Sequence, residues 1–125
     1  MIPGPPIHPP AIVRHADVAH AEPVHWTCKQ LRRLWVANGG PRNQQDEAAA
    51  VSFAESSGYR WAQHINGPGN VDKGLWQINN IYWPGLSTYN VKQNVRAAIL
   101  IHGRDGWTAW SSVKAGAENG ECGYP

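Results

Sequence analysis

Three segments of the chain place apolar residues at the spacing of helices. The first begins after Thr27, which forms a capping box with Gln30. Its apolar positions share one helical face: Cys28, Leu31, Leu34 and Trp35. We expect Gly39 and Gly40 to end this helix, because glycine readily adopts the left-handed conformation that follows a helix.

The second and third segments also carry start and stop signals. An Ala-rich stretch predicts a helix over about residues 44–57, with Asn43 as its cap and Gly58 as its terminator. The third helix is expected to start at Asn90 and to end at Gly103. Its predicted apolar face consists of Val91, Val95, Ala98, Ile99 and His102.

The rest of the chain has no long segment with apolar residues at helical spacing. Turn signals within residues 59–89 predict a small irregular hairpin and a connector, and residues 107–113 predict a last short helical or turn segment. The fold class expected is therefore α+β, mostly α, with a small β-hairpin. Residues 1–25 carry five prolines in their first ten positions, which indicates a flexible arm or linker before a domain over residues 26–125.

Composition narrows the function classes. A chain of 125 residues is one domain, and a net charge of +2 is too small to indicate nucleic-acid binding. No apolar run approaches the ~18 residues that span a bilayer, and no basic segment followed by an apolar one predicts a signal peptide. Four histidines precede residue 26, but their spacing does not fit a metal site. Seven tryptophans against one phenylalanine suggest both core packing and an aromatic groove.

Two carboxylates are the candidate chemistry. Glu55 lies in the last turn of an apolar helix, where the helix dipole and desolvation would both raise its pKa, as a general acid requires. Asp72 lies 17 residues further on among polar neighbours, where it would stay ionised. One protonated and one ionised carboxyl across a cleft is the arrangement of glycoside hydrolysis. The structural alternatives are a surface Glu at a helix end and an Asp that caps a turn.

Four short motifs in order resemble the lysozyme-like superfamily, which includes lytic transglycosylases and phage and actinobacterial lysozyme-like domains. They are ESSG at residues 55–58, GLWQIN at 74–79, NVRAA at 94–98 and GWTAW at 106–110. Animal lysozymes are the type case of the two-carboxylate arrangement. The run from Asp72 to Asn79 is similar to the strand of those enzymes that carries the second catalytic carboxylate, at the same separation from the Glu.

The resemblance implies a fold with a cleft beside the hairpin and cleavage of peptidoglycan between N-acetylmuramic acid and N-acetylglucosamine. Glu55 would be the general acid and Asp72 the second carboxylate. The residues implied to bind substrate are Ser56, Gln77, Asn79, Tyr82, Trp83 and Tyr89. Ser56 could instead satisfy a helix-end carbonyl. The alternatives are a lytic transglycosylase that uses Glu55 alone, a non-catalytic glycan-binding or structural tail domain, and chitin hydrolysis.

The resemblance also implies a disulfide between Cys28 and Cys122, which would form outside a reducing cytoplasm. A phage lysin released by lysis, or a virion-associated enzyme, would account for such a bridge without a signal peptide. No metal or cofactor is implied, because two carboxyls suffice for glycoside cleavage. We expect a monomer or one domain of a larger phage protein, with no nucleic-acid or membrane partner.

Overall fold

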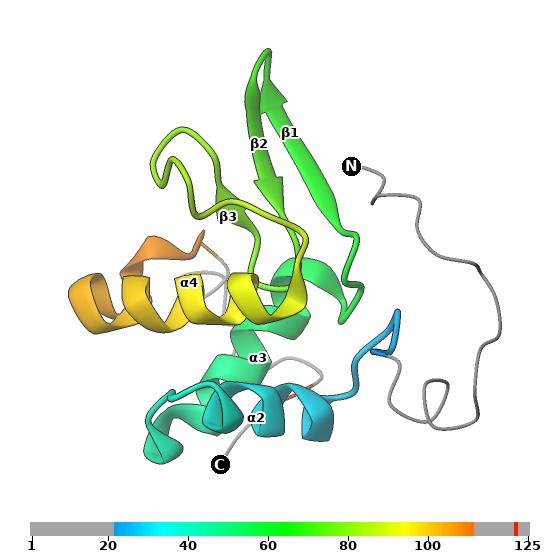
Figure 1. Cartoon of the computed structure of the whole chain (residues 1–125), viewed down its shortest axis with the longest axis vertical. Helices are drawn as coiled ribbons and strands as arrows, with labels where there is room; N and C mark the ends of the chain where they lie inside the picture. Colours follow the sequence, from blue (N-terminus) through cyan, green and yellow to red (C-terminus); the bar gives the residue numbers. More distant parts are fainter. Residues whose placement is uncertain (1–21, 112–121, 123–125) are drawn as a thin grey trace, which may run out of the picture.

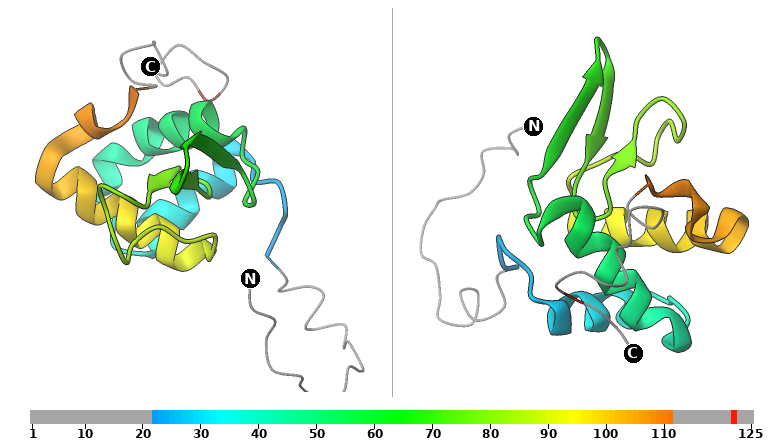
Figure 2. Two further views of the ribbon diagram at one scale, coloured as in Figure 1. Left: turned by 90° about the horizontal axis from the view of Figure 1, so that it is seen from above. Right: turned by 180° about the vertical axis from the view of Figure 1, so that it is seen from behind.

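The computed structural model describes residues 22–111 and residue 122 and shows the predicted α+β, mostly α, class. The helices form one part of the molecule and the hairpin of β1 and β2 projects from it (Figures 1 and 2). The elements, in chain order, are α2 (Cys28–Ala37), η1 (Arg42–Gln44), α3 (Gln45–Ser56), β1 (Gln63–Gly67), β2 (Asn70–Lys73), β3 (Ile78–Asn79), α4 (Val91–Asp105) and η2 (Gly106–Ala109).

Helix α2 begins as its capping box predicts. The Thr27 hydroxyl accepts the Gln30 backbone N–H, and the Thr27 N–H donates to Gln30 Oε1 at 2.8 Å. Leu31 and Trp35, one turn apart, are the fully buried residues of this helix. The helix is thus fixed at its start by local hydrogen bonds and along one side by core packing.

The start of α3 differs from the prediction. Asn43 is not its cap, because residues 42–44 form a 3₁₀ turn in which the Gln44 N–H donates to the Pro41 carbonyl. The end of the helix is a left-handed pair, Ser57 at φ 56° and Gly58 at φ 79°. A Cβ on Gly58 would lie 2.3 Å from the Trp26 carbonyl oxygen, so this terminator must be glycine.

Helix α4 starts at the predicted place but ends later. Asn90 Oδ1 accepts the Gln93 N–H at 2.9 Å, and the helix then continues through Gly103 to Asp105. The predicted end at Gly103 is wrong, because a glycine inside a helix costs only ~1 kcal/mol and packing on both sides outweighs that cost. The buried positions are Val91, Asn94, Val95, Ala97, Ala98 and Ile101. The predicted Ile99 and His102 are only partly buried.

The sheet has three antiparallel strands, one more than predicted. The third strand, β3, was not predicted because it is only two residues long. Gln63 pairs with Lys73 and His64 with Asp72 across β1 and β2. Asp72 also pairs with Asn79 of β3. Since successive side chains of a strand point to opposite faces, Asp72 and Lys73 define two different faces of this sheet.

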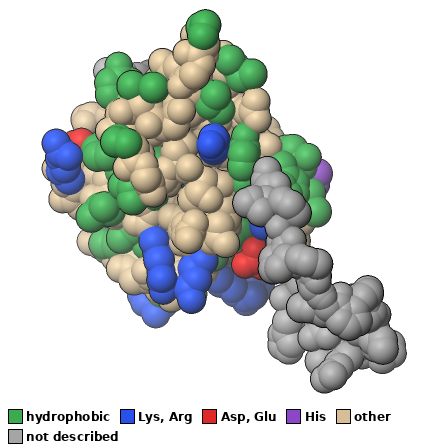
Figure 3. Space-filling view, turned by 45° about the horizontal axis from the view of Figure 1, so that its top comes forward, with side chains coloured by type: hydrophobic (Ala, Val, Ile, Leu, Met, Phe, Trp, Pro, Cys, Tyr) green, Lys and Arg blue, Asp and Glu red, His purple; other side chains and the backbone are tan. Residues whose placement is uncertain are grey.

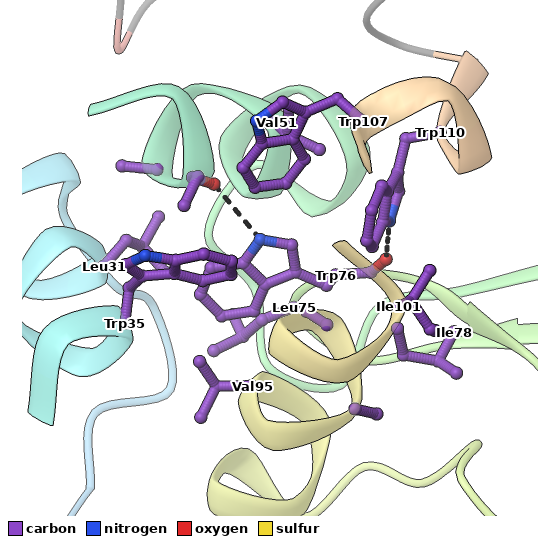
Figure 4. Packing of buried hydrophobic residues seen from close by; sticks show 14 of the residues in the cluster. Leu31, Trp35, Val51, Leu75, Trp76, Ile78, Val95, Ile101, Trp107 and Trp110 are labelled. Atoms are coloured by element: carbon purple, nitrogen blue, oxygen red, sulfur yellow. Dashed lines mark hydrogen bonds between the residues drawn. The ribbon is translucent and has the colours of Figure 1, made fainter. Parts of the chain in front are cut away.

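Four tryptophans supply much of the core: Trp35, Trp76, Trp107 and Trp110. The two indole N–H groups drawn with dashed lines in Figure 4 both have partners, since Trp76 Nε1 donates to Ala48 O at 3.1 Å and Trp110 Nε1 to Trp76 O at 2.7 Å. These bonds tie α3, the segment after β2 and the end of η2 into one core. Four of the seven tryptophans therefore serve core packing, the first of the two roles that the sequence suggests.

A disulfide links Cys28, the first residue of α2, to Cys122, with a Cα–Cα distance of 5.5 Å. This is the pairing that the family resemblance implies. The predicted arm at residues 1–25 lies mostly outside the described residues, as do residues 112 and 113 of the last predicted segment. Within the described part of the chain, no helix is long and apolar enough to cross a membrane.

Candidate active site

Glu55 lies in the last turn of α3 and is partly buried. One turn earlier, Ser52 Oγ donates to the Leu75 carbonyl at 2.9 Å. Residues three apart share a side of a helix, so Glu55 lies on the same side of α3 as Ser52. This is the side that the hydrogen bond from Ser52 attaches to the segment after β2. The end of α3 and the segment after β2 are therefore held together at the position of the first carboxylate.

Ser56 takes the helix-end role that the sequence left open. Its hydroxyl donates to the Ser52 carbonyl at 2.9 Å and accepts the Gly58 N–H at 3.2 Å. The residue is 7% exposed. These bonds fix the turn that follows Glu55.

Asp72 is held on its sheet face by a neighbouring side chain. Asn79 Nδ2 donates to Asp72 Oδ1 at 2.8 Å and to Asn70 Oδ1 at 2.7 Å. Asn79 Oδ1 accepts the backbone N–H groups of Ile81 and Tyr82. The amide of Asn79 therefore connects the second candidate carboxylate to the loop that follows β3.

A buried asparagine on α4 holds the turn between β2 and β3 by hydrogen bonds. Asn94, fully buried on α4, accepts the Trp76 N–H at 2.8 Å and donates to the Lys73 and Thr88 carbonyls. Gly74, at φ 82°, passes so close that a Cβ there would lie 2.4 Å from Asn94 Nδ2. The sequence motifs at residues 74–79 and 94–98 thus meet in space.

Gln77 belongs to the same turn and adopts a left-handed backbone conformation, φ 49°. Its Nε2 donates to the Ala62 carbonyl at 3.0 Å and to the Gly74 carbonyl at 2.8 Å. A non-glycine residue in this region carries backbone strain, which proteins tend to keep at functional sites. Through its two side-chain hydrogen bonds, Gln77 joins the segment just before β1, at Ala62, to the segment just after β2, at Gly74.

A pocket of about 290 Å³ lies beside β3. One side is formed by the strand and the loop after it, the other by the ends of α4 and η2. Its lining residues are Gln77, Ile78, Asn79, Tyr82, Trp83, Ile101, Asp105, Ala109 and Trp110. Four of the residues predicted to bind substrate are thus brought together. Asp105 and Ala109 were not predicted, although Asp105 directly precedes the GWTAW motif.

The aromatic side chains of this loop differ in exposure. Tyr82 is 77% exposed, whereas Trp83 is partly buried and packs against the core. The guanidinium of Arg104 lies 5.4 Å from the Trp83 ring centroid and fixes this side of the pocket from α4. On the face shown in Figure 3, hydrophobic and uncharged groups predominate, while Lys and Arg gather at its lower edge. The pocket's lining combines aromatic faces with one acidic residue, Asp105, and therefore suits a sugar ring better than a polyanion.

Tyr89 does not join this pocket. Its hydroxyl donates to Gln63 Oε1 at 2.5 Å, and its ring lies 6.0 Å from that of Trp61. Burial raises the pKa of the Tyr89 phenol, so the hydroxyl remains a donor at neutral pH. Among the described residues, no group of three His, Cys, Asp or Glu side chains could hold a metal ion.

Comparison with known proteins agrees with this geometry. The family model described as lysozyme-like domain matches residues 32–112. Lysozyme 1 of Musca domestica is 32% identical over 127 aligned positions, covering 82% of this chain and 88% of that protein. Lysozyme X of Drosophila melanogaster is 33% identical over 103 positions, covering 66% of this chain and 70% of that protein.

The chain belongs to the lysozyme-like domain family. It is an enzyme of the glycosidase kind, a muramidase or a lytic transglycosylase. The insect relatives agree with the similarity of the Asp72 strand to animal lysozymes. The phage or actinobacterial branch expected from the motifs stays a prediction.

Proposed function

We propose that this chain is a muramidase, which hydrolyses the β-1,4 bond between N-acetylmuramic acid and N-acetylglucosamine in peptidoglycan. The observation that carries the proposal is the hydrogen bond from Asn79 to Asp72, which holds the second carboxylate, on β2, against a residue of β3 that lines the pocket. Lytic transglycosylases manage with the Glu alone and have no need of such an arrangement.

In the proposed reaction Glu55 donates a proton to the glycosidic oxygen, and the leaving sugar departs with a free hydroxyl. Asp72 stabilises the oxocarbenium-like sugar or attacks it, and water then adds to the anomeric carbon and returns a proton to Glu55. Both carboxylates come from one chain, so a monomer suffices. The glycan would lie along the pocket, with Tyr82 and Trp83 against its sugar rings.

The first experiment is mass spectrometry of the soluble fragments released from purified peptidoglycan. Reducing muramic acid ends are expected, because water is the acceptor. Fragments one water lighter, with anhydro ends, would instead identify a lytic transglycosylase. Release of fragments from chitin oligomers but not from peptidoglycan would identify a chitinase. Either anhydro ends or cleavage of chitin alone would overturn the muramidase proposal.

Matched variants assign the roles. Glu55→Gln should abolish turnover and keep binding to insoluble peptidoglycan, because it removes the proton and preserves the shape of the side chain. Asp72→Asn should slow hydrolysis strongly by removing the charge that stabilises the transition state. Unchanged turnover in Glu55→Gln would contradict Glu55 as the general acid. Glycan binding without any turnover by the unsubstituted chain would identify a glycan-binding protein.

A further inference from the structure

The face of the sheet opposite Asp72 carries an aromatic ring and a cation. Lys73 follows Asp72 in β2 and therefore points to the other face, where it pairs with Gln63 of β1. Tyr89 lies over that pair, since its hydroxyl donates to Gln63 and Lys73 Nζ lies 5.7 Å from its ring centroid. The sheet thus has one face with the second carboxylate and one with an aromatic ring and a cation.

A hollow of about 300 Å³ opens beside Tyr89. It is lined by Arg60, Trp61, Thr88, Tyr89 and Asn90. Trp61 is 43% exposed and inclined at 49° to the Tyr89 ring, while the Arg60 guanidinium lies 4.3 Å from the Trp61 ring centroid. Arg60 braces the indole, which leaves two aromatic surfaces, a hydroxyl and an amide around one opening.

This hollow is separate from the pocket beside β3, and the two share no lining residue. Asn90 caps the start of α4 and lines the hollow, whereas Asp105 ends the helix and lines the pocket. Asp105 is the last of the 15 helical residues that follow Asn90, which corresponds to about 22 Å at 1.5 Å per residue. A glycan unit in the hollow would therefore not compete with one in the pocket.

The chemistry of the hollow fits an acidic sugar. The C–H face of a pyranose is apolar and slightly positive, so it packs against the negative face of an indole or phenol ring. No Asp or Glu lines the hollow among the described residues. Glu22, the acid near it, pairs with Arg60 at 3.3 Å. Lys73 is not one of the lining residues, but its ammonium lies 5.7 Å from the ring centroid of Tyr89, which is, and it supplies the positive charge for a carboxylate on the ligand.

We propose that this hollow is a second glycan-binding site, which takes an N-acetylated pyranose with an acidic arm, as in the muramyl unit of peptidoglycan with the carboxylates of its peptide. The identity of the polymer rests on the proposed function, whereas the site itself rests on the geometry of Trp61, Tyr89 and Lys73. Holding the wall at one site raises the effective concentration of glycan at the other. The site would thus increase activity on insoluble wall and not on short soluble substrates.

The binding test uses the Glu55→Gln chain and sedimentation with insoluble peptidoglycan. Trp61→Ala should weaken binding about fivefold to tenfold, since it removes the main aromatic surface. Trp61→Phe should keep most of the binding. The matched control is Tyr59→Ala, an aromatic of similar exposure two residues away that does not line the hollow. Lys73→Gln should weaken binding to peptidoglycan and not to chitin, which lacks the carboxylate.

The activity test uses Trp61→Ala with Glu55 intact. Turnover of a soluble muropeptide tetrasaccharide should match the unsubstituted chain, while the rate on insoluble wall should fall. Equal binding by the Trp61→Ala and Tyr59→Ala chains, or a parallel loss on the soluble substrate, would overturn the second site. If no glycan is cleaved at all, the proposed function fails, and the sedimentation result still decides the binding site independently.

Discussion

Asn79 Nδ2 lies 2.8 Å from Asp72 Oδ1, while Asn79 Oδ1 accepts the N–H groups of Ile81 and Tyr82. One amide therefore orients the second carboxylate and fixes the start of the loop that carries the groove aromatics. In the proposed mechanism, this side chain would connect binding of a sugar by that loop to charge stabilisation by Asp72.

Replacing Asn79 by Ala should lower kcat about tenfold to a hundredfold, because a hydrogen bond to a charged group contributes ~1.5–3 kcal/mol. A double-mutant cycle with Asp72→Asn measures the coupling. Asn79→Ala should cost little once Asp72→Asn is present, because the charged carboxylate that Asn79 orients is then gone. Additive losses in kcat would show that Asn79 acts independently of Asp72.

Asn94→Ala should lower the free energy of unfolding by about 3 kcal/mol or more. The change leaves the Trp76 N–H and the Lys73 and Thr88 carbonyls without the partner that Asn94 supplies. Urea unfolding measures the loss. Asn90→Ala is the control, since an exposed helix cap contributes only about 1 kcal/mol. Equal losses in the two variants would contradict the role of Asn94 as a buried link.

Removing the Cys28–Cys122 bridge should lower stability by roughly 4–5 kcal/mol, because the bond closes a long loop with a sequence separation of 94 residues. The Cys28→Ser, Cys122→Ser double variant and the reduced chain should unfold at similar urea concentrations. A shift below ~1 kcal/mol would mean that packing alone restrains the ends of the domain.

His102 should make stability depend on pH. Its ring lies 4.4 Å from that of Trp107, and burial lowers its pKa from the ordinary 6.5, an effect that the charge of Glu47 opposes. As pH falls through 6.5 the unfolded chain binds a proton before the folded chain does, so this residue's contribution to stability decreases. Between about pH 7.5 and pH 5, Tm should fall less in His102→Gln than in the unsubstituted chain. An identical fall in both would rule out this contribution.

Local signals predicted the starts of α2 and α4, because these caps depend on neighbouring residues, but not the start of α3, where Asn43 lies within a 3₁₀ turn. Thr27 with Gln30 and Asn90 with Gln93 both form the hydrogen bonds expected. Helix ends were harder: Gly103 stays helical, because packing along α4 outweighs the intrinsic preference of one glycine. A two-residue strand such as β3 leaves no alternation pattern from which it could be predicted.

The pocket could be predicted largely from motif resemblance, since Gln77, Asn79, Tyr82 and Trp83 lie close together in sequence. The position of Tyr89 could not, because it depends on the contact with Gln63, 26 residues away. Trp61 was missed as a ligand-contacting candidate for a similar reason. Its partners come from the loop before α4, and no local pattern marks that encounter.

The tryptophan core gives this enzyme a built-in optical reporter. Ring centroids separated by 6.2 Å between Trp35 and Trp76, 5.4 Å between Trp35 and Trp107, and 5.3 Å between Trp107 and Trp110 allow these indoles to exchange excitation energy. Their near-ultraviolet dichroism reports on core packing and, through Trp110, on one wall of the pocket beside β3. A collisional quencher instead reaches Trp61, which is 43% exposed. Quenching of Trp61 fluorescence can therefore follow ligand binding at the hollow beside Tyr89, while near-ultraviolet dichroism monitors the core in the same sample.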